Sequence, residues 1–481
     1  MEEKKGLSED WLAVWLGLFI FALSLGVFSG VDLLGWVVKT GIWTDMAKAL
    51  SPISEVYGKL GGLGSLVATY LFLLVVMLIG GWALKVNMGR FMVGFTVIFW
   101  VSYLCWIGGS WANIAVTTPA EMGKFGISWS LKLTPEAGFI IALVVGLLIG
   151  NFYPRCAEAI KEAVKPELYI KTAIVILGGF LGVMAAEKLG LATVVMFRGL
   201  CAIIEAYLIY WAIVYFVARK WFKFSREWAA PLASGISICG VSAAIATGSA
   251  IKARPIVPIM VSSLVVIFAV VELLILPFVA ENLLWNQPMV AGAWMGLAVK
   301  TDGAAVASGA ITDALIRAKT LALSGVNYQE GWIMGASATV KIFIDIFIGI
   351  WAFILAIIWC SVIERKPGEK VSPSQIWERF PKFVLGYAIT FIIILVICLS
   401  SPELLSKAKT AMGEANVFRG IFFTMTFFTI GVLSNFKKLW EEGIGKLVAV
   451  YVLCLFGFII WIGLFISWIF FHGIRPPVVT G

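Results

Sequence analysis

The sequence predicts an all-α membrane protein that crosses the bilayer many times. Hydrophobic residues make up 61% of the 481 positions and charged residues 14%, and the mean hydropathy is +0.97. A water-soluble core cannot use that much apolar surface. The apolar residues also gather in runs of about twenty. That is the length a helix needs to cross a hydrocarbon layer about 30 Å thick, and it is too long for barrel strands.

These runs predict about thirteen transmembrane helices. They lie near residues 11–29, 65–85, 90–107, 138–153, 169–186, 192–218, 229–248, 255–279, 288–314, 330–364, 377–400, 418–436 and 445–471. The first run follows a short polar segment and has no A-x-A-type cleavage site. We therefore expect it to be a retained anchor rather than a signal peptide.

Membrane topology explains the net charge of +9 better than a nucleic-acid partner does. The basic residues are spread over loops and form no stripe with interleaved aromatic residues. An N-terminus in the cytoplasm puts most basic loops inside, as the positive-inside rule favours, although Lys252 and Arg254 then lie outside. We expect a multi-pass protein of a bacterial or archaeal cytoplasmic membrane whose partners are the lipid bilayer and a small solute, with no nucleic acid.

Residues typical of cofactor, metal or hydrolytic chemistry are scarce. The seven cysteines are scattered without C-x-x-C spacing, and the one histidine, His472, follows the last apolar run. The sequence contains no Walker A loop and no dinucleotide fingerprint. We therefore expect no enzymatic activity, no metal site and no cofactor.

The chain is expected to contain an accessory segment followed by two repeats. Residues 1–137 carry three predicted helices with little charge at membrane depth, and from about residue 138 onward glycines and charges enter the apolar runs. Residues 138–285 and 286–481 each offer five spans, and the two sets have opposite topology. This is the pattern of an inverted-repeat transporter. A homodimer formed through the first three helices is a further hypothesis.

Two segments are unusually rich in small and polar residues. They are SGISICGVSAAIATGSAIKARP (234–255) and TMTFFTIGVLSNF (424–436). Small residues allow close packing between helices. They also permit a broken helix, whose freed backbone groups line a site near the bilayer midplane. Both interpretations stay open from sequence, and the second makes each segment the fourth span of its repeat.

Charged residues at membrane depth are costly, and they must face protein or water. The candidates are Arg198, Glu205, Glu272, Lys300, Asp302, Asp313, Lys341 and Asp345. Lys341 and Asp345 lie one helical turn apart, so they form either a structural ion pair or part of a proton or ion relay. Lys300 and Asp302 lie among small residues that leave room for a ligand. Glu272 has no partner in its own run, so it is either protonated or paired across the bundle.

Several motifs resemble the bacterial YeiH-type proteins, the family called sulfate exporters. SICGVSAAIATGSAIKA (237–253) is similar to the family's S-I-C-G-x-x-A-x-x-A-T signature. LLIGNFYP (147–154), IVILGGFLG (174–182), GLAVKTDGAAVASG (296–309) and FFTIGVLSNFKKLWEEG (427–443) follow the order of four other family segments. The resemblance covers residues 138–471. The chain departs from the family at Gly248 and Ser249, where Glu-Pro is common, and at Lys300 and Thr301, which replace His-Glu.

The resemblance implies a fold related to bile-acid and arsenite transporters, with inverted five-helix repeats, core and panel domains, and two broken helices that cross. It implies a secondary transporter of a small anion such as sulfate, sulfite or an organosulfonate. The expected substrate-binding residues are Ser237, Gly240, Ser242, Thr247, Lys300, Thr301, Thr429, Gly431, Ser434 and Asn435. The expected residues for coupling to H⁺ or Na⁺ are Asp302, Lys341, Asp345 and Glu272. The alternatives are a cation/proton antiporter of the same fold, an anion channel and a non-transporting scaffold.

Overall fold

The structure is a computed structural model, and it describes residues 8–116, 119–131, 133, 135, 137–189, 202, 204–329, 331–364, 377, 382–433 and 444–478. Contacts divide the chain into two compact units. Unit 1 comprises Met1–Ala115, Pro135–Gly190 and Lys382–Lys438, and unit 2 comprises Val116–Thr134, Leu191–Pro381 and Leu439–Gly481. Each unit is therefore assembled from segments that lie far apart in the sequence.

The described residues confirm the predicted all-α polytopic architecture. Nine helices are long and apolar enough to cross a membrane, and Ala137–Phe152 with Pro154–Ala163, bent by 112°, gives a tenth candidate span in this part of the chain. The predicted count of thirteen spans stays a prediction. The helix α2 shows why the surface needs lipid. Its large apolar side chains point outward once per turn at Val67, Leu71, Val75, Ile79 and Trp82, which is a face that water would not tolerate.

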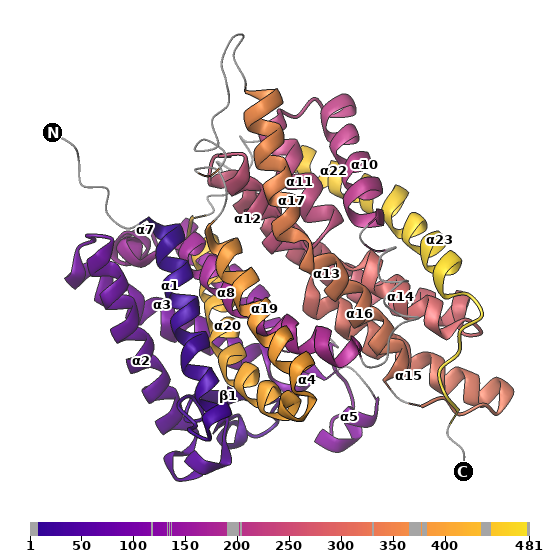
Figure 1. The fold of residues 1–481 in the computed structure, drawn as a ribbon, viewed down its shortest axis with the longest axis horizontal. Helices are drawn as coiled ribbons and strands as arrows, with labels where there is room; N and C mark the ends of the chain where they lie inside the picture. The colour runs from indigo at the N-terminus through magenta and orange to yellow at the C-terminus, as the bar shows by residue number, and fades with distance from the viewer. Residues whose placement is uncertain are drawn as a thin grey trace. The chain divides into compact units, whose positions relative to one another are not determined.

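Unit 1 contains the N-terminal helices and five later ones, most of which are labelled in Figure 1. Its α-helices are α1 (Glu9–Ser24), α2 (Gly61–Ala83), α3 (Met88–Gly109), α4 (Ala112–Ala115), α6 (Ala137–Phe152), α7 (Pro154–Ile160), α8 (Pro166–Leu189), α19 (Lys382–Ser400) and α20 (Leu405–Leu433). Short 3₁₀ turns are η1 (Leu25–Ser29), η2 (Met46–Lys48), η3 (Glu55–Leu60), η4 (Lys161–Ala163) and η8 (Pro402–Leu404). The strands β1 (Val38–Thr40) and β2 (Leu50–Pro52) pair antiparallel, with Lys39 opposite Ser51.

The helix α8 forms the centre of unit 1, and α1, α19 and α20 all pack against it. Its glycines allow this. A Cβ on Gly178 would lie 2.2 Å from the Tyr387 carbonyl oxygen, and one on Gly182 would lie 2.8 Å from that of Phe391. These distances are too short for any side chain, so α19 lies directly against the α8 backbone.

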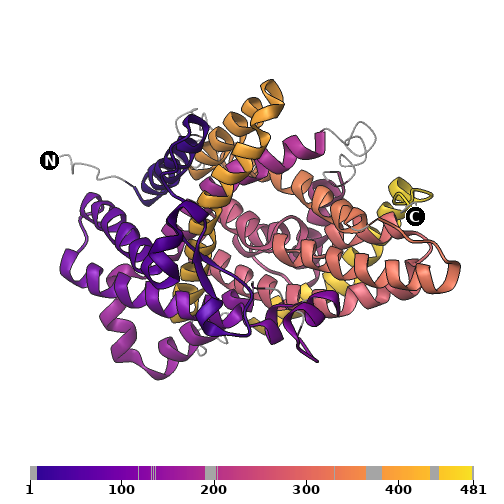
Figure 2. The ribbon, with the colours of Figure 1, turned by 90° about the horizontal axis from the view of Figure 1, so that it is seen from below.

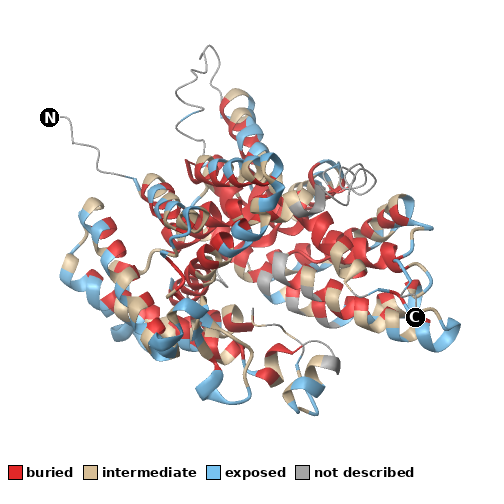
Figure 3. Cartoon of the chain, turned by 60° about the horizontal axis from the view of Figure 1, so that its bottom comes forward, coloured by how far each residue is buried: buried red, intermediate tan, exposed pale blue. Residues whose placement is uncertain are grey.

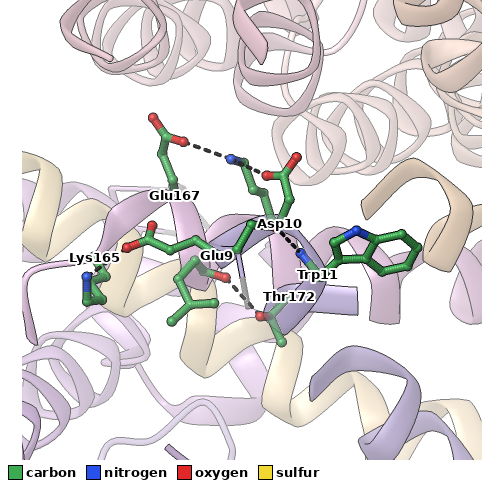
Figure 4. A network of polar contacts seen from close by, with 9 residues as sticks. Glu9, Asp10, Trp11, Lys165, Glu167 and Thr172 are labelled. Atoms are coloured by element: carbon green, nitrogen blue, oxygen red, sulfur yellow. Dashed lines mark hydrogen bonds and ion pairs between the residues drawn. The ribbon is translucent and has the colours of Figure 1, made fainter. Parts of the chain in front are cut away.

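Ion pairs fix the N-terminal helix to α8 (Figure 4). Lys171 Nζ lies 2.7 Å from Asp10 Oδ1 and 2.7 Å from Glu167 Oε2, and Lys165 Nζ lies 2.7 Å from Glu9 Oε1. The helices α1, α2 and α3 therefore belong to the same compact unit as α6, α8, α19 and α20. The expectation that residues 1–137 form an accessory segment stays a prediction. The proposed repeat boundaries stay a prediction.

Unit 2 contains the remaining helices, which Figure 2 shows from a second direction. Its α-helices are α5 (Pro119–Phe125), α10 (Trp211–Phe216), α11 (Arg226–Ser237), α12 (Gly240–Ala250), α13 (Ile256–Leu284), α14 (Pro288–Ala298), α15 (Asp302–Ser324), α16 (Trp332–Ile346), α17 (Ile348–Ile358), α22 (Ile444–Cys454) and α23 (Ile460–Phe471). Short π-helical segments are η5 (Ile204–Tyr210), η6 (Val217–Trp221), η7 (Trp359–Ile363) and η9 (Leu455–Ile459).

One hydrophobic core runs through unit 2, from η5 and α10 across α11–α16 to α22 and α23. Trp294, Tyr210 and Tyr451 are its largest fully buried aromatic residues. In Figure 3, buried residues lie on the helix faces that meet other helices. Lys300 and Lys341 are only 1% and 2% exposed. Charges buried this deeply need partners inside the unit, and those partners define the candidate site.

Candidate functional site

Two interrupted helices meet inside unit 2. The first interruption separates α11, which ends at Ser237, from α12, which begins at Gly240. The second separates α14, which ends at Ala298, from α15, which begins at Asp302. Each break leaves backbone carbonyls at the end of one helix and N–H groups at the start of the next. Such groups need partners when they are buried.

Glycine is required at the start of α12. The φ angle of Gly240 is +27°, a region that residues with a side chain rarely adopt. A Cβ there would lie 2.4 Å from Val265 Cγ1 and 3.1 Å from the Lys300 carbonyl oxygen. The backbone of the first break therefore lies against the backbone of the second, and only glycine fits between them.

Lys341 joins the two breaks. This side chain comes from α16, and its Nζ donates hydrogen bonds to the Ile238 carbonyl oxygen at 2.8 Å and to the Lys300 carbonyl oxygen at 3.3 Å. The first carbonyl follows α11 and the second follows α14, where the dipoles of these helices are negative. One buried ammonium therefore neutralises both C-terminal ends. The predicted pairing of Lys341 with Asp345 stays a prediction.

Lys300 and Glu272 form a second set of contacts at the two helix breaks. Glu272 on α13 accepts a hydrogen bond from the Lys300 backbone N–H through Oε2, at 3.0 Å. The Lys300 ammonium donates to the Leu297 carbonyl oxygen and lies 4.6 Å from the centroid of the Tyr210 ring, a cation–π distance. The two predicted residues Lys300 and Glu272 are thus brought together. Their contact uses the lysine backbone rather than its side-chain charge.

Carboxyl groups are as prominent as lysines in this unit. Glu272 and Asp345 are 1% and 2% exposed, and Glu205 is fully buried. Within the described part of the chain, Glu272 Oε1 and both oxygens of Glu205 have no hydrogen-bond donor. The backbone of Asp302 begins α15, but its side chain lies outside the described residues. The candidate site therefore contains both cationic and acidic side chains.

The predicted hydroxyl residues divide into two kinds. Thr247 is fixed in a structural contact, because its Oγ1 lies 2.6 Å from Ser234 Oγ, which also accepts a hydrogen bond from the Trp211 indole. Ser237, at the end of α11, is fully buried, and its Oγ has no partner among the described residues. Ser242 is also buried, and Thr301 is the residue before α15. Ser237 is thus the hydroxyl that the first break leaves available.

The prediction of a broken helix at 424–436 is wrong for the described part of that segment. The helix α20 continues without interruption through Thr429 and Gly431 to Leu433, and it belongs to unit 1. The Thr429 hydroxyl bonds to the Met425 carbonyl oxygen of its own helix, at 2.7 Å. Ser434 and Asn435 lie outside the described residues.

Close helix packing explains the small residues of this segment. A Cβ on Gly431 would lie 2.3 Å from the Leu143 carbonyl oxygen. A Cβ on Gly146 of α6 would lie 2.1 Å from that of Phe428. The backbones of α6 and α20 therefore touch, and the packing alternative holds here.

Sequence reasoning missed the second break and the neighbourhood of Glu205. The small residues of 296–309 predict room for a ligand, whereas Thr301 followed by Asp302 is a typical helix start. Only one helix, α13, separates the interrupted pair α11–α12 from the interrupted pair α14–α15 in the sequence. Glu205 lies in the π-helical segment η5, and no sequence signal identifies such a segment.

Comparison with known proteins identifies the family. The family model described as "Conserved hypothetical protein 698" matches residues 127–450, which include both helix breaks. A UPF0324 membrane protein of Nitrosomonas europaea is 43% identical over 476 residues, covering 98% of this chain and 97% of the relative. The chain belongs to the UPF0324 family of membrane proteins. This confirms the predicted resemblance to the YeiH-type proteins.

Other relatives are more distant or shorter, and the first of them is also a UPF0324 membrane protein. One of Rhodopirellula baltica is 30% identical over 416 residues, covering 85% of this chain and 66% of the relative. An uncharacterized protein of Archaeoglobus fulgidus is 50% identical over 166 residues, covering 30% of this chain and 89% of the relative. No solved structure matches the chain. The UPF0324 assignment therefore establishes a multi-pass membrane protein, and the chemistry of the site has to be argued from its own residues.

Proposed function

We propose that this UPF0324 protein is a secondary transporter of a small anion, and that the paired helix breaks form its substrate site. The observation that carries the proposal is the position of Lys341, whose ammonium bonds to the carbonyls of both breaks. With the C-terminal ends of α11 and α14 neutralised in this way, the positive N-terminal ends of α12 and α15 are left for a substrate. Broken helices serve this purpose in other transporter folds.

The chemistry at the breaks favours an oxyanion. The N-terminus of α12 offers backbone N–H groups, Ser237 offers an available hydroxyl, and Lys300 offers a buried positive charge nearby. Partial charges of about half a unit at helix ends suit a small ion better than a large one. We propose sulfate, sulfite or an organosulfonate as the substrate class. Transport would occur by alternating access in a bacterial or archaeal cytoplasmic membrane and be driven by H⁺ or Na⁺.

A cation/proton antiporter is the second candidate, and one observation favours it. Lys341 already has two carbonyl partners, whereas Glu272 and Glu205 retain carboxyl oxygens without donors in the described part of unit 2. Oxygens of this kind suit a cation or a proton better than an anion. In this alternative the lysines hold the breaks together, and the carboxyls are the transport site.

Ligand-induced stabilisation of the purified protein separates these candidates. The panel contains sulfate, sulfite, thiosulfate, a small sulfonate, bicarbonate and acetate, each with and without Na⁺ and at two pH values. A ligand at about a hundred times its Kd adds about 2.7 kcal/mol to the stability of the folded state. A shift with one class of oxyanion supports the anion carrier. Shifts with Na⁺ or pH alone would replace it with the antiporter.

Variants then test the site itself. Lys300→Ala should weaken anion binding at least tenfold, while Lys446→Ala, on an exposed position of α22, should leave it unchanged. In proteoliposomes a carrier saturates and exchanges labelled for unlabelled anion. Current that stays linear with anion concentration would indicate a channel instead. Unchanged affinity in Lys300→Ala would remove this residue from the site.

A further inference from the structure

Glu205 is a buried carboxyl group that the proposed substrate site does not use. It lies in η5 (Ile204–Tyr210), a π-helical segment, and it is fully buried in unit 2. Neither of its oxygens has a hydrogen-bond donor among the described residues. Burying a carboxylate without donors is expensive, so such a group persists only where it has a task or carries a proton. π-Helical turns are themselves frequent at functional sites.

A phenol and a glycine flank this carboxyl group. A Cβ on Gly463 of α23 would lie 2.6 Å from Tyr210 Oη and 3.5 Å from Glu205 Oε1, so both groups face the same glycine. The Tyr210 hydroxyl donates its hydrogen to the Ile459 carbonyl oxygen at 2.8 Å. The Tyr210 hydroxyl and the Glu205 carboxyl group therefore lie side by side next to α23.

The ring of Tyr210 connects this carboxyl group to Lys300 at the second helix break. Lys300 Nζ lies 4.6 Å from the ring centroid, and the Lys300 backbone N–H in turn bonds to Glu272. A change in charge at Glu205 is therefore felt by the ammonium that faces the second break. This places Glu205 beside the proposed substrate site without making it a ligand.

The charged groups on the surrounding elements leave Glu205 without a direct counterion in the described part of unit 2. The segment between α14 and α15 contributes Lys300, α13 contributes Glu272, and α16 contributes Lys341 and Asp345. The tyrosines of η5 are Tyr207, which donates to the Ile344 carbonyl oxygen, and Tyr210. The helix α23 has no charged side chain, and α11 has Arg226 and Glu227 only in its first turn.

We infer that Glu205 is the residue that carries the coupling proton of this transporter. The inference rests on the proposed carrier function and names its coupling ion as H⁺. The step is simple in its balance. A proton from water on one side forms the O–H bond of the Glu205 acid, and the same bond breaks when the proton leaves to water on the other side. Glu272 is less suited to this role, because one of its oxygens holds the backbone at the second break.

The test compares Glu205→Gln with the wild type in proteoliposomes, using labelled sulfate first and sulfite and a small sulfonate next. Glutamine keeps the shape of the side chain but cannot take up a proton. We expect Glu205→Gln to lose accumulation driven by a pH gradient at least tenfold, while counterflow of labelled against unlabelled anion stays within about threefold. Glu414→Gln is the matched control. Glu414 is also buried without donors in the described residues, but it belongs to unit 1.

The possible results separate the two proposals. Gradient-driven accumulation that persists in Glu205→Gln would overturn the role of Glu205 and leave the carrier function intact. Wild-type accumulation that is unaffected by the pH gradient would do the same. A wild type that exchanges no anion would overturn the carrier function itself. If Glu205→Gln does not fold, Gly463→Ala perturbs the same contact, and Gly457→Ala, whose Cβ would meet only Leu453 at 3.7 Å, is its control. Coupling should then fall in the first and stay normal in the second.

Discussion

Replacing Lys341 with methionine tests whether this lysine holds the two helix breaks together. Methionine has a similar length but no donor, so the carbonyl oxygens of Ile238 and Lys300 lose hydrogen bonds of 2.8 and 3.3 Å. A hydrogen bond to a charged group contributes about 1.5–3 kcal/mol, so two of them contribute at least about 3 kcal/mol. Removal of the buried ammonium relieves a desolvation cost and offsets part of this loss. We expect a net loss of about 2–3 kcal/mol of unfolding free energy.

Equilibrium unfolding in mixed micelles measures this loss. Lys341→Arg keeps the charge and the donors, so its loss should be clearly smaller than that of Lys341→Met. Lys446→Met removes an equal charge from an exposed position of the same unit and should stay within about 0.5 kcal/mol of the wild type. A Lys341→Met protein as stable as the Lys446→Met control would refute the reasoning. The breaks would then be held by their packing, and the argument that frees the N-termini of α12 and α15 would fall with it.

Three further substitutions test particular contacts. Gly240→Ala places a methyl group where φ is +27° and a valine carbon lies 2.4 Å away, so it should lower the unfolding free energy by roughly 1–3 kcal/mol. Gly445→Ala, whose methyl group would have nothing within 4 Å, should not lower the unfolding free energy. Thermal unfolding measures both. Gly431→Ala should destabilise unit 1 by a similar amount. Gly420→Ala on the same helix has open space for its methyl group and should be neutral or stabilising. Equal melting temperatures of the two variants would contradict the close contact of α6 and α20. Asp10→Asn removes one of two carboxylates from a lysine that is 4% exposed, and it should raise protease sensitivity near the N-terminus; unchanged cleavage would mean that the ion pair does not fix α1.

Fold class and family could be predicted because they depend on features that the sequence displays directly. Hydrophobic run length identifies membrane helices without any knowledge of how they pack. The segment 237–253 carries both the family signature and the first break, so the unusual composition of that stretch indicated its role correctly. Charged residues at membrane depth are rare and usually functional, so the sequence could select Lys300, Lys341 and Glu272.

The second break could not be located in the same way, because composition does not distinguish close packing from interruption. Residues 424–433 and 237–247 are similarly rich in glycine and hydroxyl side chains. The difference lies in what meets each glycine. A helix backbone meets Gly431, which can stay helical, whereas Gly240 has positive φ and meets the turn at Lys300. Those neighbours come from distant parts of the chain, so only the tertiary structure reveals them. The π-helical turn at Glu205 is hidden for the same reason.

The arrangement of charges in unit 2 links substrate and coupling ion in one electrostatic system. The Lys300 ammonium lies against the Tyr210 ring, and the Lys300 backbone N–H donates a hydrogen bond to Glu272. Glu205 lies beside the same tyrosine. In a buried site the addition of an anion without a compensating positive charge is costly. A proton on Glu205 removes one negative charge from this neighbourhood and so favours entry of the anion. Binding of the anion favours the proton equally, because such coupling is reciprocal. Tight coupling then needs no direct contact between the two ions. It needs only that both ions change the electrostatic surroundings of the same cation, Lys300.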